Sequence, residues 1–528
     1  MFHSAILSLI LESAITPYLI ILTSVFYIGR YMLVRQLDPK CRLRLPGPRG
    51  LPYVGSIPFL GSENKLHLTF TKLAKKYGPI YRLSLGSSEA VIISDPNLIK
   101  EAFRMDQFSA RPDMLFVKEI VSGNGIILSE GDMWKEQRRF ALQQMRHLGM
   151  YRLASEEDQL SQKIQSEIRY FTDTLEERSG QPIGLDYLLG GVMGNIICTI
   201  ICGKRFAYDD PTFLGCLSTM EEGFRLVKLS MGINFMPFLR IIPMMNTVYL
   251  KIKDNNIATK AFFRSLIKER ADTIEVGKTR DFVDAYLHQI QRLQDAEKFE
   301  TSNFTDAQMM QCVIDLFSAG METTRTSLEW AFLYMALHPE VQSQVQEELD
   351  RVVGIERVPS MDDLKELPFT EATICEVLRA SSVVPLGNPH AASEDTMFHG
   401  HLVPKGATIF SNLWAVHNDE TLWHNPSEFN PSRFLVDGKV ERPPHFMPFS
   451  TGRRVCLGDH LAKAEIYLVF ASVLQRFQVS IPAGESKPDC QGLFGMTLKP
   501  KAHRLSMTLR HKPKSVQPAT FTEPARPA

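Results

Sequence analysis

One cysteine near the end of the chain has neighbours that suit it to metal ligation. Cys456 lies in the segment FMPFSTGRRVCLGDHLAKAE, in which Gly452 and Gly458 permit tight turning and the close approach of another body. A helical pattern begins just after the cysteine, and the N-terminus of a helix favours a thiolate. A thiolate held rigidly at such a turn is a soft, electron-rich ligand suited to iron. The alternative, an inert buried cysteine, is opposed by the adjacent cations Arg453 and Arg454.

A second set of polar residues interrupts an otherwise apolar helical segment, DLFSAGMETTRTSLEW. Glu322 and Thr323 put an acid and a hydroxyl in the middle of this helix, where Gly320 is also costly. Such residues are tolerated where a ligand lies against the helix, and Ala319 and Gly320 would leave space for one. A threonine that bonds back to a carbonyl can also open the helix locally. The alternative is a solvent-facing patch on an amphipathic helix, and the pattern alone leaves both open.

A third motif places an acid and an arginine on one face of a helix. Glu376 and Arg379 are three residues apart in EVLR and can pair, although such pairs are common on surfaces and contribute little. Arg433 follows in FNPSRF, between the apolar residues Phe429 and Phe434. A buried Glu–Arg–Arg trio would need every member to be satisfied. The spacing alone does not predict such a trio.

Together these segments resemble the motifs of the cytochrome P450 superfamily. The cysteine segment matches its haem-binding loop position for position, in Phe449-x-x-Gly452-x-Arg454-x-Cys456-x-Gly458. The other motifs match in order too: Trp134-x-x-x-Arg138, Ala319-Gly320-x-Glu322-Thr323, Glu376-x-x-Arg379 and Arg433. The N-terminal apolar run, the PGPRGLP hinge and the CGKRF segment are similar to the microsomal enzymes of family 2. The likeness covers residues 45–508, and Asp459 departs from it, because the family usually has glutamate there.

The resemblance implies a role for each matched residue. The Cys456 thiolate would be the axial ligand of the iron of haem b. The remaining cofactor-binding residues would be Arg454, Arg138, Trp134 and His390 at the haem propionates, with Phe449 and Gly458 in the loop. Glu322 and Thr323 would form the acid–alcohol pair that delivers protons to dioxygen. The structural trio, needed for folding and haem retention, would be Glu376, Arg379 and Arg433.

The implied reaction is that of a haem-thiolate monooxygenase, which inserts one oxygen atom of dioxygen into a lipophilic substrate such as a fatty acid, a steroid or a xenobiotic. The chain has no Gly-x-Gly-x-x-Gly fingerprint, so electrons must come from outside. NADPH–cytochrome P450 reductase is the implied donor, with cytochrome b5 as a further candidate partner. The basic residues Lys135, Arg138, Arg139 and Lys463 could form the docking surface. Two alternatives remain: a haem-thiolate isomerase or dehydratase that acts without reductase, and a non-catalytic haem-binding protein.

By the same analogy, seven apolar residues would line the substrate pocket: Phe116, Ile120, Phe317, Ala319, Val384, Leu386 and Phe494. The run MGINFMPFLRIIPMM (231–245) is rich in Met, Ile and Phe. It is interpreted either as a lid that enters the membrane or as ordinary core packing.

Bulk composition limits the other function classes. The 528 residues are 44% hydrophobic, and 59 Lys and Arg balance 59 Asp and Glu. This zero net charge gives no support to nucleic-acid binding. The eight cysteines are scattered and include no CxxC pair, which argues against a disulfide framework and against structural zinc.

The elements expected to position these residues form a mainly α (α+β) body with a small β-rich region, the cytochrome P450 fold. A hairpin is predicted over 79–94, and the predicted helices are 156–178, 186–202, 258–274, 304–337, 339–353, 368–380 and 458–477. Thr305 and Gln308 form a capping-box pattern at the start of the longest helix.

The N-terminal segment predicts attachment to a membrane. Residues 13–34 are long and apolar enough to span a bilayer, and the basic flank that follows favours a cytosolic body. The predicted divisions are a membrane anchor (1–34), a basic and proline-rich hinge (35–52), a catalytic domain (53–508) and a disordered tail (509–528). With the resemblance, this predicts a single-pass protein of the endoplasmic reticulum membrane, recovered in microsomes.

Overall fold

The computed structural model describes residues 29, 43–61, 65–86, 88–114, 117–150, 159–275 and 277–511. Its helical body with small β-sheets agrees with the predicted fold class. Within these ranges no helix combines the length and the apolar character needed to cross a membrane. The predicted anchor, apart from residue 29, lies outside them, as do the hinge up to residue 42 and the tail from residue 512. These features and the proposed domain divisions stay predictions.

The longer helices account for most of the body. In chain order they are α3 (Leu66–Tyr77), α4 (Pro96–Arg104), α5 (Gly131–His147), α6 (Gln159–Glu177), α7 (Asp186–Cys202), α8 (Pro211–Leu229), α9 (Met231–Phe235), α10 (Pro243–Ala271), α11 (Phe282–Asp295), α12 (Asp306–Leu337), α13 (Pro339–Val352), α14 (Pro368–Ser381), α15 (Leu413–His417) and α16 (Asp459–Arg476). Short turns complete the set: η2 (Ile57–Phe59), η4 (Asp106–Phe108), η5 (Val117–Val121), η6 (Pro237–Ile241), η7 (Phe299–Thr301), η8 (Asp363–Glu366), η9 (Pro431–Phe434) and η10 (Gly452–Arg454).

The strands form several small sheets. The largest has the order β1 (Ile80–Leu85), β2 (Ser88–Ile93), β7 (Thr408–Ser411) and β4 (His390–Ala391), and only its β2–β7 pair is parallel. A second antiparallel sheet has the order β10 (Phe477–Ser480), β13 (Leu505–Leu509) and β3 (Pro182–Ile183). Three antiparallel pairs complete the described strands: β5 (Thr396–Phe398) with β6 (His401–Val403), β8 (Leu435–Val436) with β9 (Lys439–Val440), and β11 (Leu493–Phe494) with β12 (Leu498–Lys499).

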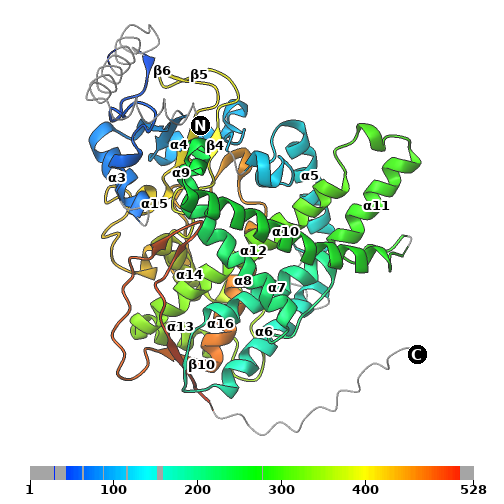
Figure 1. The fold of residues 1–528 in the computed structure, drawn as a ribbon. Helices are drawn as coiled ribbons and strands as arrows, with labels where there is room; N and C mark the ends of the chain where they lie inside the picture. Colours follow the sequence, from blue (N-terminus) through cyan, green and yellow to red (C-terminus); the bar gives the residue numbers. More distant parts are fainter. Residues whose placement is uncertain are drawn as a thin grey trace, which may run out of the picture.

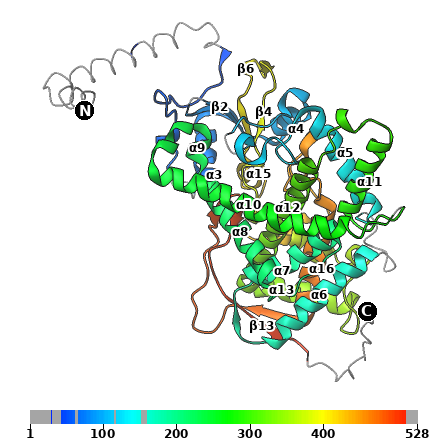
Figure 2. The same cartoon turned by 45° about the vertical axis from the view of Figure 1, so that its right-hand side comes forward.

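Helix α12 runs through the centre of the helical body. Figure 1 shows the largest sheet with α3, α4 and α15 at one end of the molecule, and α6, α13 and α16 at the other. The view in Figure 2 keeps α12 between these two ends. Helices α7, α14 and α16 all pack against α12, so most of its side chains are buried. Any polar side chain on this helix therefore has to find its partners inside the protein.

The start of α12 follows the predicted cap only in part. Thr305 is the N-cap residue, and its hydroxyl accepts a hydrogen bond from the Gln308 N–H at 3.1 Å, as the capping box requires. The reciprocal contact is replaced, because the Gln308 side chain binds both backbone groups of Gly125 at 2.9 Å. The first turn of α12 is thereby tied to the segment before α5.

The predicted helices and the hairpin are present with shifted boundaries, but the sequence pattern does not predict several further helices, among them α3, α4, α8 and α11, or the first half of α10. Helix α8 and the first half of α10 were not expected, and α10 begins at Pro243 instead of near residue 258. Its first half contains Asn246, Thr247 and Asp254, which are weak helix formers. Since α8 and α10 pack along each other, tertiary contact outweighs local propensity here.

The predicted Glu–Arg–Arg trio is assembled and fully satisfied. Glu376 and Arg379 are completely buried in α14, and Arg379 donates to both carboxylate oxygens at 2.7 and 2.8 Å. Arg433 in η9 places its Nε 3.0 Å from Oε1 of Glu376. Further donor groups of the arginines bind the carbonyls of His417 and His424, each at 2.8 Å. The trio therefore joins α14 to the irregular segment that contains η9.

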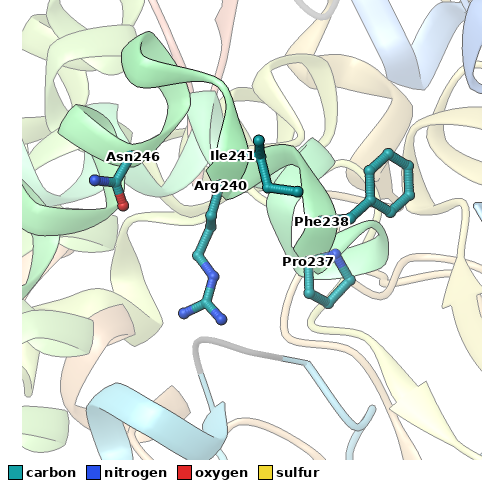
Figure 3. Close-up of a pocket in the computed structure, with 5 residues that line it drawn as sticks. All are labelled: Pro237, Phe238, Arg240, Ile241 and Asn246. Atoms are coloured by element: carbon teal, nitrogen blue, oxygen red, sulfur yellow. The ribbon is translucent and has the colours of Figure 1, made fainter. Parts of the chain in front are cut away.

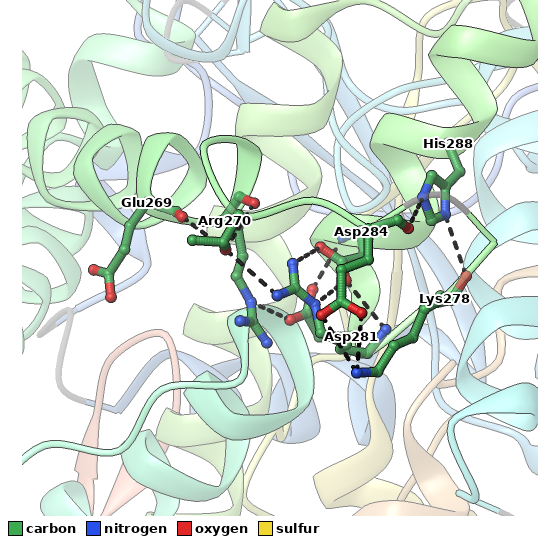
Figure 4. Close-up of polar contacts among 10 residues, drawn as sticks. Glu269, Arg270, Lys278, Asp281, Asp284 and His288 are labelled. Carbon is green, nitrogen blue, oxygen red and sulfur yellow. Dashed lines mark hydrogen bonds and ion pairs between the residues drawn. The ribbon is translucent and has the colours of Figure 1, made fainter. Parts of the chain in front are cut away.

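A second buried ionic network lies at the junction of α10 and α11 (Figure 4). The N-cap carboxylate of Asp281 is 2.5 Å from Arg270 Nε, and Asp284 is 2.6 Å from Arg280 Nε. Both carboxylates are fully buried. Gly203 at the end of α7 makes room, since a Cβ there would lie 2.1 Å from Arg270 Nη2. The network fixes the ends of three helices and includes none of the predicted site residues.

We expect Glu376→Gln to destabilise the protein strongly, because it leaves two arginines without their counter-charge. Loss of one partner in a buried ion pair costs about 3–5 kcal/mol. Urea unfolding followed by fluorescence measures this difference in the free energy of unfolding. The matched control is Glu275→Gln, because Glu275 pairs with Lys278 on the surface and should contribute little. Equal losses in the two variants would contradict the assignment.

Candidate active site

The Cys456 loop is a tight turn between η10 and α16. The N–H of Cys456 donates to the Phe449 carbonyl at 3.1 Å, and Gly458 is the N-cap residue of α16. Gly452 has φ +78°, and a Cβ there would lie 2.1 Å from the Phe103 carbonyl oxygen in α4. Only glycine meets both demands, which explains one of the two glycines in the motif.

The thiol of Cys456 is enclosed on one side and exposed on the other. Among the described cysteines, Cys456 and Cys490 are exposed and the others are buried. Desolvation by the loop raises the pKa of the thiol, while the Gly458 N–H and the cations of Arg138 and Lys463 act in the opposite direction. A thiol that the loop holds in place but leaves open on one side can contact a bound ligand or metal.

Helix α12 has one exposed turn although its neighbouring turns are buried. Ala319 is exposed and Thr323 is half-buried, and the Thr323 hydroxyl donates to the Ala319 carbonyl at 2.7 Å. This placement favours a ligand lying against the helix over a solvent-facing patch, because α12 lies inside the body in Figures 1 and 2. Gly320 has a different cause: a Cβ there would lie 2.7 Å from Ile197 of α7, so the glycine allows the two helices to approach.

Glu322 and Thr323 are adjacent in the sequence but their side chains have separate surroundings. The Glu322 carboxylate is buried, with Arg325 Nη2 at 3.1 Å and Lys499 Nζ at 2.9 Å. Successive residues of an α-helix are turned by about 100°, so neighbouring side chains do not share a face. The predicted acid–alcohol pair is therefore a pair in sequence, and its acid is held by cations.

Next along the helix, Thr324 faces a third direction. Its hydroxyl donates to Oε2 of Glu465 in α16 at 3.3 Å, and Glu465 is almost fully buried. Desolvation raises the pKa of Glu465 to about 8, and the Thr324 bond opposes this only in part. No cation contributes to this shift, so Glu465 is largely a neutral acid at pH 7. This contact links the helix after Cys456 to the helix that carries Thr323.

Buried arginines surround the base of the Cys456 loop. Arg454 is 8% exposed, donates to the carbonyls of Ser109 and Ser129 at 2.7 Å each, and lies 4.0 Å from the centre of the Trp134 ring. Its Nη1 atom has no hydrogen-bond partner in the described part of the chain. Arg138 donates to the Val455 carbonyl at 2.6 Å. The structure thus brings together three of the residues predicted to bind the cofactor.

Sequence reasoning missed one member of this group, Arg111. It is buried, and its guanidinium donates to the carbonyls of Ile127 and Pro389 at 2.7 and 2.6 Å. Desolvation, with repulsion from Arg111 and Arg138, lowers the pKa of Arg454 to about 8. The only local signal for Arg111 is an arginine directly before a proline, which carries no characteristic spacing.

His390 lies near Arg111 and Arg454, but its ring already contacts other residues of the protein. Its ring stacks on Phe103 at 3.8 Å, and its Nδ1 is 2.8 Å from the Phe108 carbonyl. Since a carbonyl only accepts, Nδ1 is the donor. Desolvation and the nearby Arg111 lower the pKa of His390 to about 3, so Nε2 carries no proton at neutral pH. A contact from Nε2 to a carboxylate would need that proton, and the role of His390 stays a prediction.

The seven residues predicted to line a substrate pocket are not all on one exposed face. Ala319 is exposed and Val384 is half-buried, whereas Phe317 is fully buried with its ring edge-on to Phe263 of α10. The others divide between small clusters: Ile120 packs with Leu226 and Ile252, and Leu386 packs with Phe494. Phe116 lies outside the described residues.

A pocket of about 490 Å³ lies at the segment 231–245, for which the sequence left a lid and core packing open; we call it the lid segment below (Figure 3). It is lined by Pro237, Phe238, Arg240, Ile241 and Asn246, none of which was predicted to act in the site. Arg240 pairs with Glu119 of η5 at 3.2 Å, which joins the lid segment to the turn that carries Ile120.

Comparison with known proteins identifies relatives over most of the chain. The family model described as Cytochrome P450 matches residues 45–507. Cytochrome P450 18a1 of Drosophila melanogaster is 38% identical over 470 residues, which cover 88% of this chain and 87% of that protein. Cytochrome P450 2J2 of Homo sapiens is 38% identical over 462 residues, with coverage of 87% and 90%. Cytochrome P450 2U1 of Rattus norvegicus is 34% identical over 488 residues, with coverage of 88% and 90%.

We expect Glu465→Gln to remove a pH dependence of stability. Because the pKa of Glu465 rises from 4.5 to about 8 on folding, its contribution is fully present below about pH 4.5 and is lost as the pH rises through 8. A tenfold change in proton affinity corresponds to about 1.4 kcal/mol, so the loss is on the order of a few kcal/mol. Glutamine keeps the shape of the neutral acid and cannot ionise.

The measurement is urea unfolding at several pH values between 5 and 9, with the exposed Glu347→Gln in α13 as control. The control should follow the wild-type curve, and Glu465→Gln should gain stability relative to wild type as the pH rises. Parallel curves for wild type and Glu465→Gln would exclude a buried neutral acid.

Proposed function

The chain belongs to the cytochrome P450 family, and we propose that it is a membrane-anchored monooxygenase that oxidises a lipophilic substrate with electrons from NADPH. Members of this family are oxidoreductases that bind haem b through a cysteine thiolate, so the enzyme class and the cofactor follow from membership. The substrate class, the electron donor, the membrane and the roles of single residues are the proposal.

The observation that carries the proposal is the buried arginine group beside an open thiol. Arg454 and Arg111 are held by backbone carbonyls, which fix their positions without neutralising them. The unpartnered Nη1 of Arg454 and its lowered pKa indicate a site that lacks negative charge. The carboxylates of haem b would supply it, with Arg138 as a further donor. Cys456 would then supply the thiolate that ligates the iron.

When bound, the haem supplies the reduction and activation of dioxygen, and the chain supplies the surroundings. The exposed turn at Ala319 gives space beside the helix, and the Thr323 hydroxyl holds a proton there. We assign to Thr323 the delivery of protons during the reaction, with Glu322 as the acid behind it. A polar hydroxyl at this turn favours a monooxygenase over an isomerase or dehydratase, which would need no proton supply for dioxygen.

The remaining partners are inferred from exposed groups. Lys135 is 54% exposed and Lys463 is 48% exposed, which suits them to meet an acidic face of NADPH–cytochrome P450 reductase. On the lid segment, Phe238, Ile241 and Met244 are 54%, 85% and 66% exposed. An exposed apolar group of this kind supports contact with the endoplasmic reticulum membrane, together with the predicted anchor. Cytochrome b5 stays a further candidate partner.

We expect Cys456→Ser to lose the spectral signature of the thiolate ligand. A serine hydroxyl is hard and poorly ionised, so it replaces a soft thiolate badly at iron. The measurement is the absorption spectrum of the reduced, carbon-monoxide-treated protein, whose red-shifted Soret band should disappear. Cys490→Ser changes the other cysteine that is exposed in the described part of the chain and should keep the band. A Soret band retained by Cys456→Ser would mean that another residue ligates the iron.

We expect Thr323→Ala to keep its haem content but to couple NADPH consumption to product formation less efficiently. Proton delivery of this kind is typically worth roughly 10²–10⁴-fold, although a water molecule can replace the hydroxyl and reduce the loss. The substrate is whichever of lauric acid, progesterone or 7-ethoxycoumarin the wild-type protein oxidises in the presence of reductase. With that substrate, the product formed per NADPH should fall and the hydrogen peroxide released per NADPH should rise. Ser318→Ala, which removes a hydroxyl that bonds back to Asp315 in the same helix, is the control. A wild-type ratio in Thr323→Ala would refute the role of Thr323.

A further inference from the structure

A buried ionic cluster lies against α12 on the side occupied by Glu322. Three of its members, Glu322, Arg325 and Glu329, are on one face of the helix and are only 3%, 5% and 6% exposed. Two further members, Lys499 of β12 and Glu221 of α8, have side chains that are 25% and 39% exposed. The cluster therefore runs from the helix core to the surface.

The two carboxylate oxygens of Glu322 differ, because Oε1 accepts hydrogen bonds whereas Oε2 has an ion-pair neighbour but no hydrogen-bond partner among the described residues. Oε1 accepts from Lys499 Nζ and from the Thr497 hydroxyl, each at 2.9 Å. Oε2 lies 3.1 Å from Arg325 Nη2. Arg325 is shared, because its Nε is 3.4 Å from Glu329 and its Nη2 is 3.6 Å from Glu221. Of the groups that contact Glu322, only those at Oε1, Lys499 and Thr497, come from outside α12. The contacts at Oε1 can therefore change without a change in the helix itself.

That outside hold belongs to the hairpin β11–β12. Phe494, a predicted substrate contact, is in β11 and pairs in register with Leu498 of β12. The backbone of Leu498 is fixed on both sides, since its carbonyl accepts from Trp330 of α12 at 2.7 Å and its N–H donates to Val383 at 2.7 Å. Val383 precedes Val384, another predicted contact. The same short hairpin thus contains the predicted substrate contact Phe494, binds the residue before Val384, and holds the Glu322 carboxylate.

The charges around Glu322 are unequal in number. Glu322, Glu329 and Glu221 face Arg325 and Lys499, and Asp186 of α7 adds a further negative charge nearby. Desolvation raises the pKa of Glu329 to about 7, so the cluster contains a group that exchanges protons near neutral pH. Lys499 and Glu221 give this cluster access to bulk water.

We propose that Lys499 and Thr497 are positioning residues for Glu322, and that through them the β11–β12 hairpin controls the supply of protons to the Thr323 turn. This inference rests on the proposed function, because it takes protons to be consumed at Thr323. Glu322 takes up a proton that arrives from water at the exposed end of the cluster and releases it toward Thr323, which regenerates the carboxylate. Contact of a substrate with Phe494 alters the hairpin and thereby the hold on Oε1.

The test compares Lys499→Met with Lys501→Met in the haem-loaded, full-length protein with reductase. Lys501 lies two residues further along and pairs with exposed Asp489, so it is a matched control. For Lys499→Met we expect released peroxide per NADPH to rise roughly 3- to 10-fold with the probes lauric acid or progesterone. This is less than the full effect of acid–base assistance, because Arg325 keeps the other oxygen. Lys499→Arg should restore the wild-type ratio.

A second readout does not depend on activity. Lys499→Met leaves Glu322 with one cation fewer, so the thermal unfolding midpoint of this variant should lie below that of the wild-type protein at pH 7. Lys501→Met should show no such difference. Thr497→Val removes a donor to the same oxygen with little change of volume, and a smaller rise in peroxide is expected for it. If Lys499→Met proves unstable, Thr497→Val and Lys499→Arg carry the test.

The outcomes separate this inference from the proposed function. A lowered midpoint with wild-type peroxide release in Lys499→Met and Thr497→Val would overturn the inference and make the cluster structural only. If Thr323→Ala releases excess peroxide and the Lys499 and Thr497 variants do not, the inference alone fails. If the Lys499 and Thr497 variants release peroxide and Thr323→Ala does not, the hold on Glu322 stands and the assignment of Thr323 fails.

Discussion

The site depends on positive charge that the protein buries without neutralising it. Arg454 and Arg111 lie side by side at the base of the Cys456 loop, and their main hydrogen bonds go to backbone carbonyls. Carbonyl oxygens fix the direction of a guanidinium but carry no full negative charge. Desolvation, with repulsion from neighbouring arginines, lowers the pKa of Arg454 to about 8 and that of Arg111 to about 9, although Glu130 and Asp315 oppose these shifts in part. Burial of this kind is costly unless an anion joins the group, and the carboxylates of a haem meet that need.

The centre of the fold serves this site by giving consecutive residues different surroundings. Glu322, Thr323 and Thr324 follow one another in α12, yet the first meets cations, the second an exposed turn and the third a buried acid in α16. The period of the α-helix makes this possible, because neighbouring side chains point in different directions. One turn of helix therefore connects the β11–β12 hairpin, the open side of the site and the helix that follows Cys456.

The sequence is sufficient for features that are local and insufficient for those that join distant segments. A few neighbouring residues are enough to predict the Cys456 turn, the cap at Thr305 and the long apolar helix. Arg111 is not, because its partner Pro389 is 278 residues away and no local pattern marks the contact. The partners of Glu322 in the β11–β12 hairpin, Thr497 and Lys499, escape prediction for the same reason. Gly320 shows a subtler error, since the glycine expected to accommodate a ligand accommodates Ile197.

Three arginine clusters in the described residues differ in how far carboxylates neutralise them. This difference distinguishes a cluster that stabilises the fold from clusters that can take part in binding or proton transfer. Arg379 and Arg433 share the Glu376 carboxylate, which accepts from both. Every other donor described for these arginines binds a backbone carbonyl. The trio therefore needs no further hydrogen-bond partner or counter-charge, and its role is to hold α14 in place. Arg454 has an unpartnered donor and no carboxylate within bonding distance in the described residues, so it demands a ligand. Arg325 is intermediate, because its Nε has no hydrogen-bond partner in the described residues, yet three carboxylates lie within ion-pair distance of its guanidinium and acids outnumber the cations near it. A neutral cluster has one stable charge state, whereas an unbalanced one that reaches solvent has several. It is this third kind of cluster that can exchange a proton without losing its structure.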